Sequence, residues 1–126
     1  MGLYNFLPRF VPFILDGRKT HTIRAERRYP DKPGTTLHLY TGLRTKRAKL
    51  LMRVECVAVE EIEILTIEKY GGHPYVFVGG LGLNHSEKEQ LARRDGFHDF
   101  TEMIAFWEAR LPFKGHIIHW KTKKAG

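Results

Sequence analysis

The sequence contains only one cysteine, Cys56, among its 126 residues. A single thiol cannot form an internal disulfide or a metal site built from several cysteines. Its place in an apolar alternation predicts an inert core side chain. No His-Glu-x-x-His pattern is present, and His116 and His119 lie in a probable strand, where a spacing of three places them on opposite faces. We therefore expect neither a metal nor another cofactor.

Long apolar runs are also absent. No stretch approaches the ~20 apolar residues that a membrane-spanning helix needs. The first fifteen residues are apolar, but Arg9 interrupts them, Pro8 and Pro12 punctuate them, and no basic segment precedes them. This pattern does not fit a secretion signal. We expect a cytoplasmic protein without a membrane partner.

Acidic residues are scarce in one part of the chain. The net charge is +7, from 21 basic and 14 acidic side chains, but the segment 18–53 holds eleven basic residues and only two acidic ones. Such a concentration favours a polyanionic partner such as RNA, and a solvated basic surface is the alternative. The candidate nucleic-acid-binding residues come from this segment: Arg18, Arg24, Arg27, Arg28, Arg44, Lys46 and Arg47.

Hydrophobic residues make up 42% of the chain and aromatic residues 12%, which is typical of a globular protein. We see no repeat, low-complexity tract or linker, so residues 1–126 are expected to form a single domain. Alternating apolar residues predict strands within 19–24, 35–41, 48–64 and 113–121, with a bend near 59–61, and shorter segments predict helices within 5–16, 86–94 and 99–111. This order predicts an α+β fold, a small and mostly antiparallel β-barrel with inserted short helices. The predicted core includes Leu37, Leu39, Val54, Cys56 and Ile117 or Ile118.

The most informative segment is Gly17-Arg18-Lys19-Thr20-His21-Thr22-Ile23-Arg24. Gly17 suits a left-handed turn that leads into a strand. Three cations, two hydroxyls and an imidazole follow it within seven residues, a set that could bind phosphates or hold a small carbonyl ligand. An ordinary basic surface strand would carry the same residues.

This segment resembles the signature of the ASCH family, within the PUA-like superfamily. Two later segments fit the same family in the same order: Pro33-Gly34 before the strand at 35–41, and Asp95-Gly96-Phe97 before a helix that ends near Trp107. The resemblance implies a PUA-like β-barrel with a cleft for RNA or a modified nucleoside. One bacterial branch of the family hydrolyses the amide of acetylated cytidine with a lysine, a threonine and an acid. The matching catalytic positions are Lys19, Thr22 and Asp95, although the branch has glutamate where Asp95 stands.

The chemistry of these three residues is reasonable. A threonine hydroxyl needs a base to take its proton, and a lysine amine can serve if burial or nearby cations lower its pKa. In a regular strand, however, positions 19 and 22 face opposite sides. A shared site requires Lys19 to lie in the turn after Gly17, or a bulge between Lys19 and Thr22. Two other readings stay open: a non-catalytic RNA-binding module, and an adaptor whose basic face binds an acidic protein.

Overall fold

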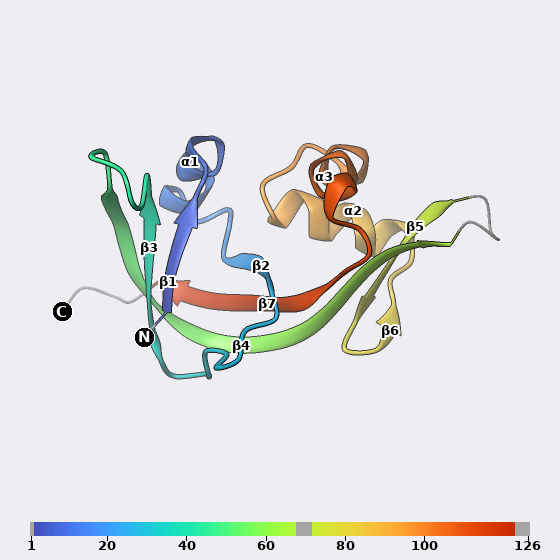
Figure 1. Cartoon of the computed structure of the whole chain (residues 1–126), viewed down its shortest axis with the longest axis horizontal. Coiled ribbons are helices and arrows are strands. Elements are labelled where there is room, and N and C mark those ends of the chain that lie inside the picture. The colour runs from blue at the N-terminus through green and yellow to red at the C-terminus, as the bar shows by residue number, and fades with distance from the viewer. Residues whose placement is uncertain (1, 68–71, 123–126) are drawn as a thin grey trace.

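The computed structural model describes residues 2–67 and 72–122, which form one mixed α+β unit dominated by a sheet (Figure 1). The strands are β1 (Gly2–Phe6), β2 (His21–Ala25), β3 (Thr36–Thr41), β4 (Lys49–Ile67), β5 (His73–Val78), β6 (Leu81–Gly82) and β7 (Phe113–Thr122). The helical segments are short: η1 (Pro8–Phe10), α1 (Val11–Leu15), α2 (His85–Arg94), α3 (Phe100–Trp107) and η3 (Glu108–Arg110). No helix in the described part of the chain is long and apolar enough to cross a membrane.

The long strand β4 organises the sheet. Val54 and Glu55 pair with both β3 and β7, so these two strands lie along opposite edges of β4. β1 extends the sheet beyond β3, and β2 extends it beyond β7, which gives the strand order β1-β3-β4-β7-β2. The β1–β3 pairing is parallel and all others are antiparallel, which confirms the expectation of a mostly antiparallel sheet.

The sheet is not closed into a barrel, so the barrel part of the predicted fold is not confirmed. No ladder joins β1 to β2 within residues 2–67 and 72–122. Instead, the Arg24 side chain on β2 donates from Nη2 to the main-chain oxygen of Asn5 on β1, at 2.7 Å. In a closed barrel, a backbone N–H of β2 would donate to the Asn5 carbonyl. Here the Arg24 side chain donates to it instead, and β1 and β2 form no backbone ladder.

The predicted core is confirmed. Leu37, Leu39, Val54 and Cys56 are fully buried, and both Ile117 and Ile118 are buried against them. Alternation therefore identified the inner face of the sheet correctly.

Three local expectations need correction. The N-terminal segment begins with a strand, β1, before its helical turns, where we expected a helix from Asn5. The register irregularities in β4 fall at Leu51, opposite β3, and between Cys56 and Ala58, opposite β7, instead of near 59–61. Helix α2 begins at residue 85 and not at 86, because Asn84 is its N-cap and forms a capping box with Glu87.

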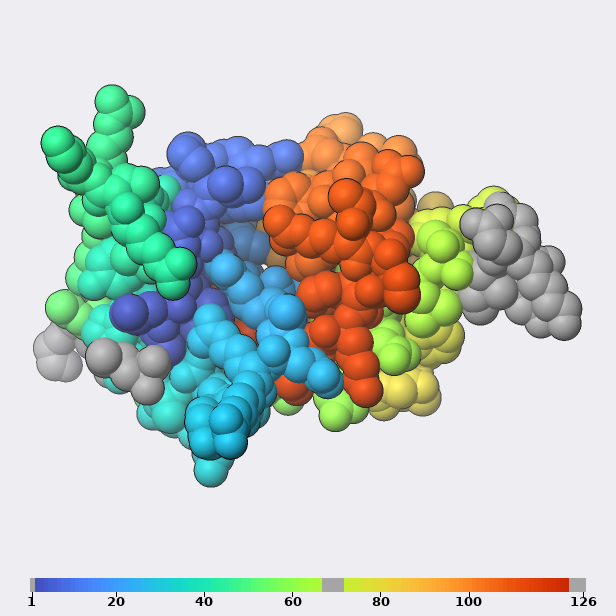
Figure 2. Space-filling view, in the orientation of Figure 1, coloured from blue at the N-terminus to red at the C-terminus, as the bar shows by residue number. Residues whose placement is uncertain are grey.

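The helices stand on one side of the sheet. In Figure 1, α1 lies above β1, and α2 and α3 lie above β7, with β2 between these groups. The same arrangement appears in the space-filling view, where the N-terminal segment, β2 and the α3 region meet on one face (Figure 2). This meeting point contains the pocket described next.

Candidate functional site

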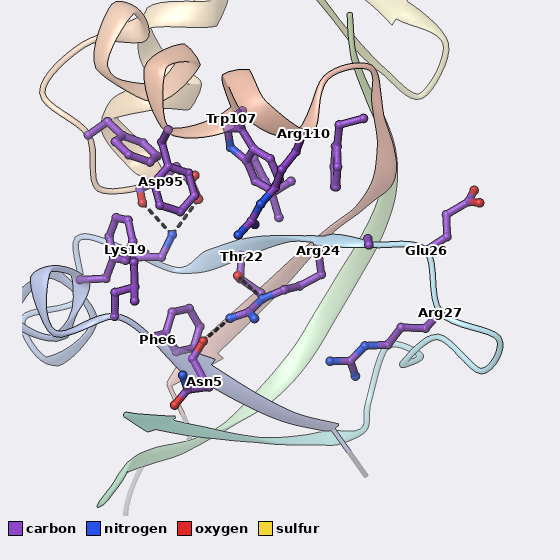
Figure 3. Close-up of a pocket in the computed structure, with 17 residues that line it drawn as sticks. Asn5, Phe6, Lys19, Thr22, Arg24, Glu26, Arg27, Asp95, Trp107 and Arg110 are labelled. Carbon is purple, nitrogen blue, oxygen red and sulfur yellow. Dashed lines mark hydrogen bonds and ion pairs between the residues drawn. The ribbon is translucent and has the colours of Figure 1, made fainter. Parts of the chain in front are cut away.

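A cavity of about 710 Å³ lies between the edge strands β1 and β2 and extends beneath α3 and η3 (Figure 3). Its volume falls within the range of about 300–1,000 Å³ that is usual for small-molecule sites. The residues that line it come from four parts of the chain: Asn5, Phe6, Leu7, Phe10, Lys19, Thr22–Arg27, Asp95, Phe97, Phe106, Trp107, Arg110 and Phe113.

Lys19 reaches this cavity from a turn and not from a strand. Gly17 has a φ of +84°, and the Lys19 amide donates to the Phe13 carbonyl at 2.9 Å, which ends α1 and directs the chain toward β2. β2 begins only at His21, so strict strand alternation does not apply to Lys19. Lys19 and Thr22 therefore line the same cavity, through the turn that the sequence required.

Asp95 is positioned by the end of α2. It is the C-cap residue, and Gly96 follows with a φ of +101°. The Gly96 amide donates to the Arg93 carbonyl and the Phe97 amide to the Ala92 carbonyl, the two hydrogen bonds of a Schellman motif. The Asp-Gly-Phe sequence thus fixes the direction in which the Asp95 side chain leaves the helix.

Lys19 and Asp95 form a buried ion pair. The Lys19 Nζ donates to the Asp95 Oδ1 and also to the Asp95 main-chain oxygen, each at 2.7 Å (Figure 3). Both side chains are less than a tenth exposed. The ammonium therefore neutralises the carboxylate and also stabilises the negative end of α2.

Burial and ion pairing both shift the pKa values of Lys19 and Asp95. Burial lowers the pKa of the Lys19 amine, and the neighbouring Asp95 carboxylate opposes this shift without cancelling it. Burial alone would raise the pKa of the Asp95 carboxyl, but the Lys19 ammonium and the His21 ring hold it below its ordinary value. Lys19 therefore releases its proton more readily than a surface lysine, while Asp95 stays ionised.

His21 lies behind the pair. Its Nε2 is 3.2 Å from the Asp95 Oδ1, but this nitrogen has no well-aligned hydrogen bond within residues 2–67 and 72–122. Burial lowers the pKa of the His21 ring, so the neutral form prevails at neutral pH. His21 does not line the cavity, so it can orient Asp95 but cannot touch a ligand there.

Thr22 is held by a cation. The Arg24 Nε donates to the Thr22 Oγ1 at 2.9 Å, so the hydroxyl keeps its own proton available for donation. A cationic donor at the oxygen also favours the deprotonated hydroxyl over the neutral one. The arrangement prepares Thr22 to lose a proton.

The walls of the cavity are largely aromatic. Six aromatic side chains line it, contributed by the N-terminal segment, by the α2–α3 region and by β7: Phe6, Phe10, Phe97, Phe106, Trp107 and Phe113. The Trp107 Nε1 is buried and has no hydrogen-bond acceptor within the described part of the chain.

The predicted basic residues divide into two groups. Arg24 and Arg27 line the cavity, whereas Arg18, Arg28, Arg44, Lys46 and Arg47 do not. Arg18 pairs with Asp16, and the turn that carries Arg44, Lys46 and Arg47 projects from one end of the molecule (Figure 2). Most of the predicted basic residues therefore lie outside the cavity.

Among the residues of this region that were not predicted as site residues, three have polar side chains that bear on its chemistry. Arg110 and Asn5 line the cavity, and His21 supports Asp95. His21 lies within the segment 17–24, so its position in that motif could have identified it as a site residue. Nothing local marks Asn5 or Arg110, because the packing of η3 and β1 against β2 brings them to the site.

No group of three or more His, Cys, Asp or Glu side chains within residues 2–67 and 72–122 is arranged to hold a metal ion. Lys19, Thr22 and Asp95 instead offer an amine, a hydroxyl and a carboxylate. This set suits proton transfer and nucleophilic attack.

No protein-family model, curated protein or solved structure matches this chain.

Proposed function

We propose that this protein is an amidohydrolase that cleaves the amide of an N-acylated cytidine. The observation that carries the proposal is the convergence of Lys19, Thr22 and Asp95 on one cavity, with Lys19 and Asp95 paired although 76 residues separate them. These three positions correspond to the catalytic lysine, threonine and acid of the amidohydrolase branch that the sequence resembles, with aspartate in place of the glutamate of that branch. The resemblance also leads us to propose a PUA-like fold, and the N-terminal sequence pattern leads us to propose a cytoplasmic location.

Lys19 is the proposed base and Thr22 the proposed nucleophile. The uncharged Lys19 amine accepts the Thr22 proton, and the Thr22 oxygen attacks the acyl carbon. The carbon–nitrogen bond then breaks, and Lys19 returns the proton to the departing amino group of cytidine. Water hydrolyses the resulting threonine ester, which releases the carboxylic acid and restores the hydroxyl.

Asp95 is a positioning residue in this mechanism. It holds the Lys19 Nζ through its Oδ1 and its main-chain oxygen, which fixes the direction of the lysine lone pair or proton. Its charge also raises the basicity of Lys19 above that of a buried, unpaired lysine. The amine is thereby basic enough to accept a proton but not permanently protonated.

The remaining walls suit a nucleoside. Aromatic side chains can stack on a pyrimidine, as they do in many proteins that bind single nucleotides. The aromatic walls of the cavity therefore support a planar ligand.

The test is the release of acetate from acetylated cytidine, measured together with the affinity for the same ligand. Thr22→Val removes the hydroxyl with little change in shape, and Lys19→Arg keeps the charge but removes a group that can deprotonate near neutral pH. Both changes are expected to lower kcat by at least about 100-fold while binding persists.

Thr20→Val is the matched control, because Thr20 belongs to the same motif but is exposed and does not line the cavity. It should leave kcat unchanged. Wild-type protein that binds the nucleoside without releasing acetate would refute the enzymatic proposal. Equal turnover in wild type and Lys19→Arg would remove Lys19 from its role as base.

A non-catalytic RNA-binding module is the second candidate. Arg44, Lys46 and Arg47 are exposed on the projecting turn, and none of them forms an ion pair within the described part of the chain. Reversal of all three charges should weaken RNA binding and reduce its salt dependence. Heparin that displaces RNA only at a large excess would favour RNA over an acidic protein as the partner.

A further inference from the structure

The cavity contains more positive charge than its own carboxylates neutralise. Lys19 pairs with Asp95, Arg27 lies 3.7 Å from a carboxylate oxygen of Asp31, and Glu26 lies 4.0 Å from Lys114. Two cavity-lining guanidinium groups, those of Arg24 and Arg110, form no ion pair within residues 2–67 and 72–122.

Arg24 is the more buried of these two groups. Its hydrogen bonds go to the Thr22 hydroxyl and the Asn5 carbonyl, which are both uncharged. The Asp95 carboxylate acts on it only at longer range and is already engaged by Lys19. Arg24 is only half-buried, and Arg110 is exposed. A partly desolvated cation without a counter-ion still costs some free energy, and an anion bound beside it would offset that cost.

Arg110 approaches the same space from the opposite wall. It extends from η3 over the Trp107 and Phe106 rings, at 5.7 and 5.9 Å from their centroids. Figure 3 shows its guanidinium pointing down toward Thr22 and Arg24. The two guanidinium groups therefore face the space around the Thr22 hydroxyl.

We propose that Arg24 and Arg110 form an anion subsite beside Thr22 that binds a small carboxylate, the acid that hydrolysis releases. This inference rests on the proposed amidohydrolase function, because that function makes a carboxylate at Thr22. The subsite also receives the carbonyl oxygen of the substrate when Thr22 attacks, at the moment when that oxygen becomes negatively charged. Arg110 is thus a further residue of the site, and it comes from the opposite end of the chain to the motif.

The charge changes during the reaction fit this assignment. The attack converts a neutral amide into a tetrahedral oxyanion, and collapse of the oxyanion expels the amine and leaves a neutral ester on Thr22. Hydrolysis of the ester by water then forms the carboxylate. Two guanidinium groups, one of them held by the Thr22 hydroxyl and the Asn5 carbonyl, stabilise the oxyanion and the final carboxylate more than the neutral amide or ester.

The position of the subsite favours a carboxylate over a nucleotide phosphate. The Arg24 Nε is hydrogen-bonded to the hydroxyl of Thr22, the proposed nucleophile. Its remaining N–H groups would therefore lie near the acyl carbon of a substrate that Thr22 attacks. The base and the ribose would separate a 5′-phosphate from that carbon. A guanidinium also matches the two oxygens of a carboxylate with two parallel hydrogen bonds.

The experiment titrates sodium acetate into ¹⁵N-labelled protein at constant ionic strength, with sodium chloride as the reference salt. Acetate should shift the resonances of Thr22 and of the Arg24 Nε–H, with a Kd in the millimolar range. Arg110→Gln should weaken acetate binding by about fivefold or more, as the loss of a charge-assisted hydrogen bond predicts. Arg94→Gln removes the same charge from an exposed residue outside the cavity and should leave the affinity unchanged.

The result that overturns the subsite is an acetate titration that leaves Thr22 and Arg24 unmoved, or equal affinity in wild type and Arg110→Gln. Tighter binding of cytidine 5′-monophosphate than of cytidine, lost in Arg110→Gln and without a response to acetate, would instead assign the pair to phosphate. Acetate binding does not depend on turnover. Protein that binds acetate through Arg110 but never cleaves acetylated cytidine would refute the enzymatic proposal and support the subsite.

Discussion

Removal of both partners of the Lys19–Asp95 pair should destabilise the protein by less than the sum of the two single removals. Asp95→Asn keeps the shape of the side chain but leaves the Lys19 ammonium, which is 3% exposed, without its counter-ion. Breaking a buried ion pair in this way costs about 3–5 kcal/mol. That is a large share of the roughly 5–15 kcal/mol that stabilises an ordinary domain.

The double-mutant cycle gives the magnitude of the pairing. Lys19→Met removes the charge with similar side-chain length and strands the Asp95 carboxylate in the same way. In the double variant neither charge is left unpaired, so its loss of stability should fall short of the sum of the single losses by about 2–3 kcal/mol. Urea unfolding at neutral pH measures all four proteins, and an unchanged m-value shows that the denatured states are comparable.

The pH dependence of Asp95→Asn provides a second check. Without the carboxylate, nothing opposes the effect of burial, so the pKa of Lys19 in the folded protein falls further below its value in the unfolded chain. The unfolded state then binds more protons between these two pKa values, so stability rises with pH by up to about 1.4 kcal/mol per unit. Additive single losses, or an Asp95→Asn variant whose stability does not respond to pH, would refute the reasoning.

Two further predictions concern the supports of this pair. Gly96→Ala should cost at least about 1–2 kcal/mol, since the φ of Gly96 is +101° and a Cβ would lie 2.8 Å from the Phe10 ring. Gly34→Ala is the control for backbone strain, because Gly34 has a φ of +95° and no neighbour within 4 Å of an added Cβ. Equal losses of Tm in the two variants would contradict the proposed clash. His21→Gln should reduce the loss of folding stability at acidic pH. Burial lowers the pKa of His21 in the folded protein below its ordinary 6.5, so the unfolded chain binds a proton more readily. Wild-type stability therefore falls as the pH drops from 6.5 toward the pKa of the folded state, and the variant lacks this contribution. Urea unfolding at pH 7 and pH 5 measures this slope, and exposed His73→Gln should leave it unchanged.

Local sequence patterns predicted the centre of the sheet better than its edges. The alternation around Leu37 and Val54 is strict, and both side chains are fully buried. β1 was missed because it has five residues and leads directly into the helical turns that Pro8 begins. Whether the sheet closes could not be predicted either. It depends on whether the Asn5 main-chain oxygen accepts from the backbone of β2 or from the Arg24 side chain, and the sequence does not distinguish the two.

The candidate site was predictable only in part for a similar reason. Lys19 and Thr22 lie in one short motif, so the sequence could nominate them together. Asp95 came from the family resemblance, and its contact with Lys19 is a property of the fold. Arg110 carries no sequence signal, because its role depends on how η3 is placed above β2.

The distance along the chain between Lys19 and Asp95 has a consequence for the order in which the protein folds. Residues that are 76 positions apart meet only after a large loop closes, which disfavours their contact early in folding. During synthesis, Lys19 leaves the ribosome long before Asp95 and remains hydrated until α2 has formed and ended at Gly96. The pocket is therefore a late product of folding, and its ligand should bind only to chains that have completed both halves. Ligand binding can thus report on completion of the native fold in pulse-labelling or nascent-chain experiments.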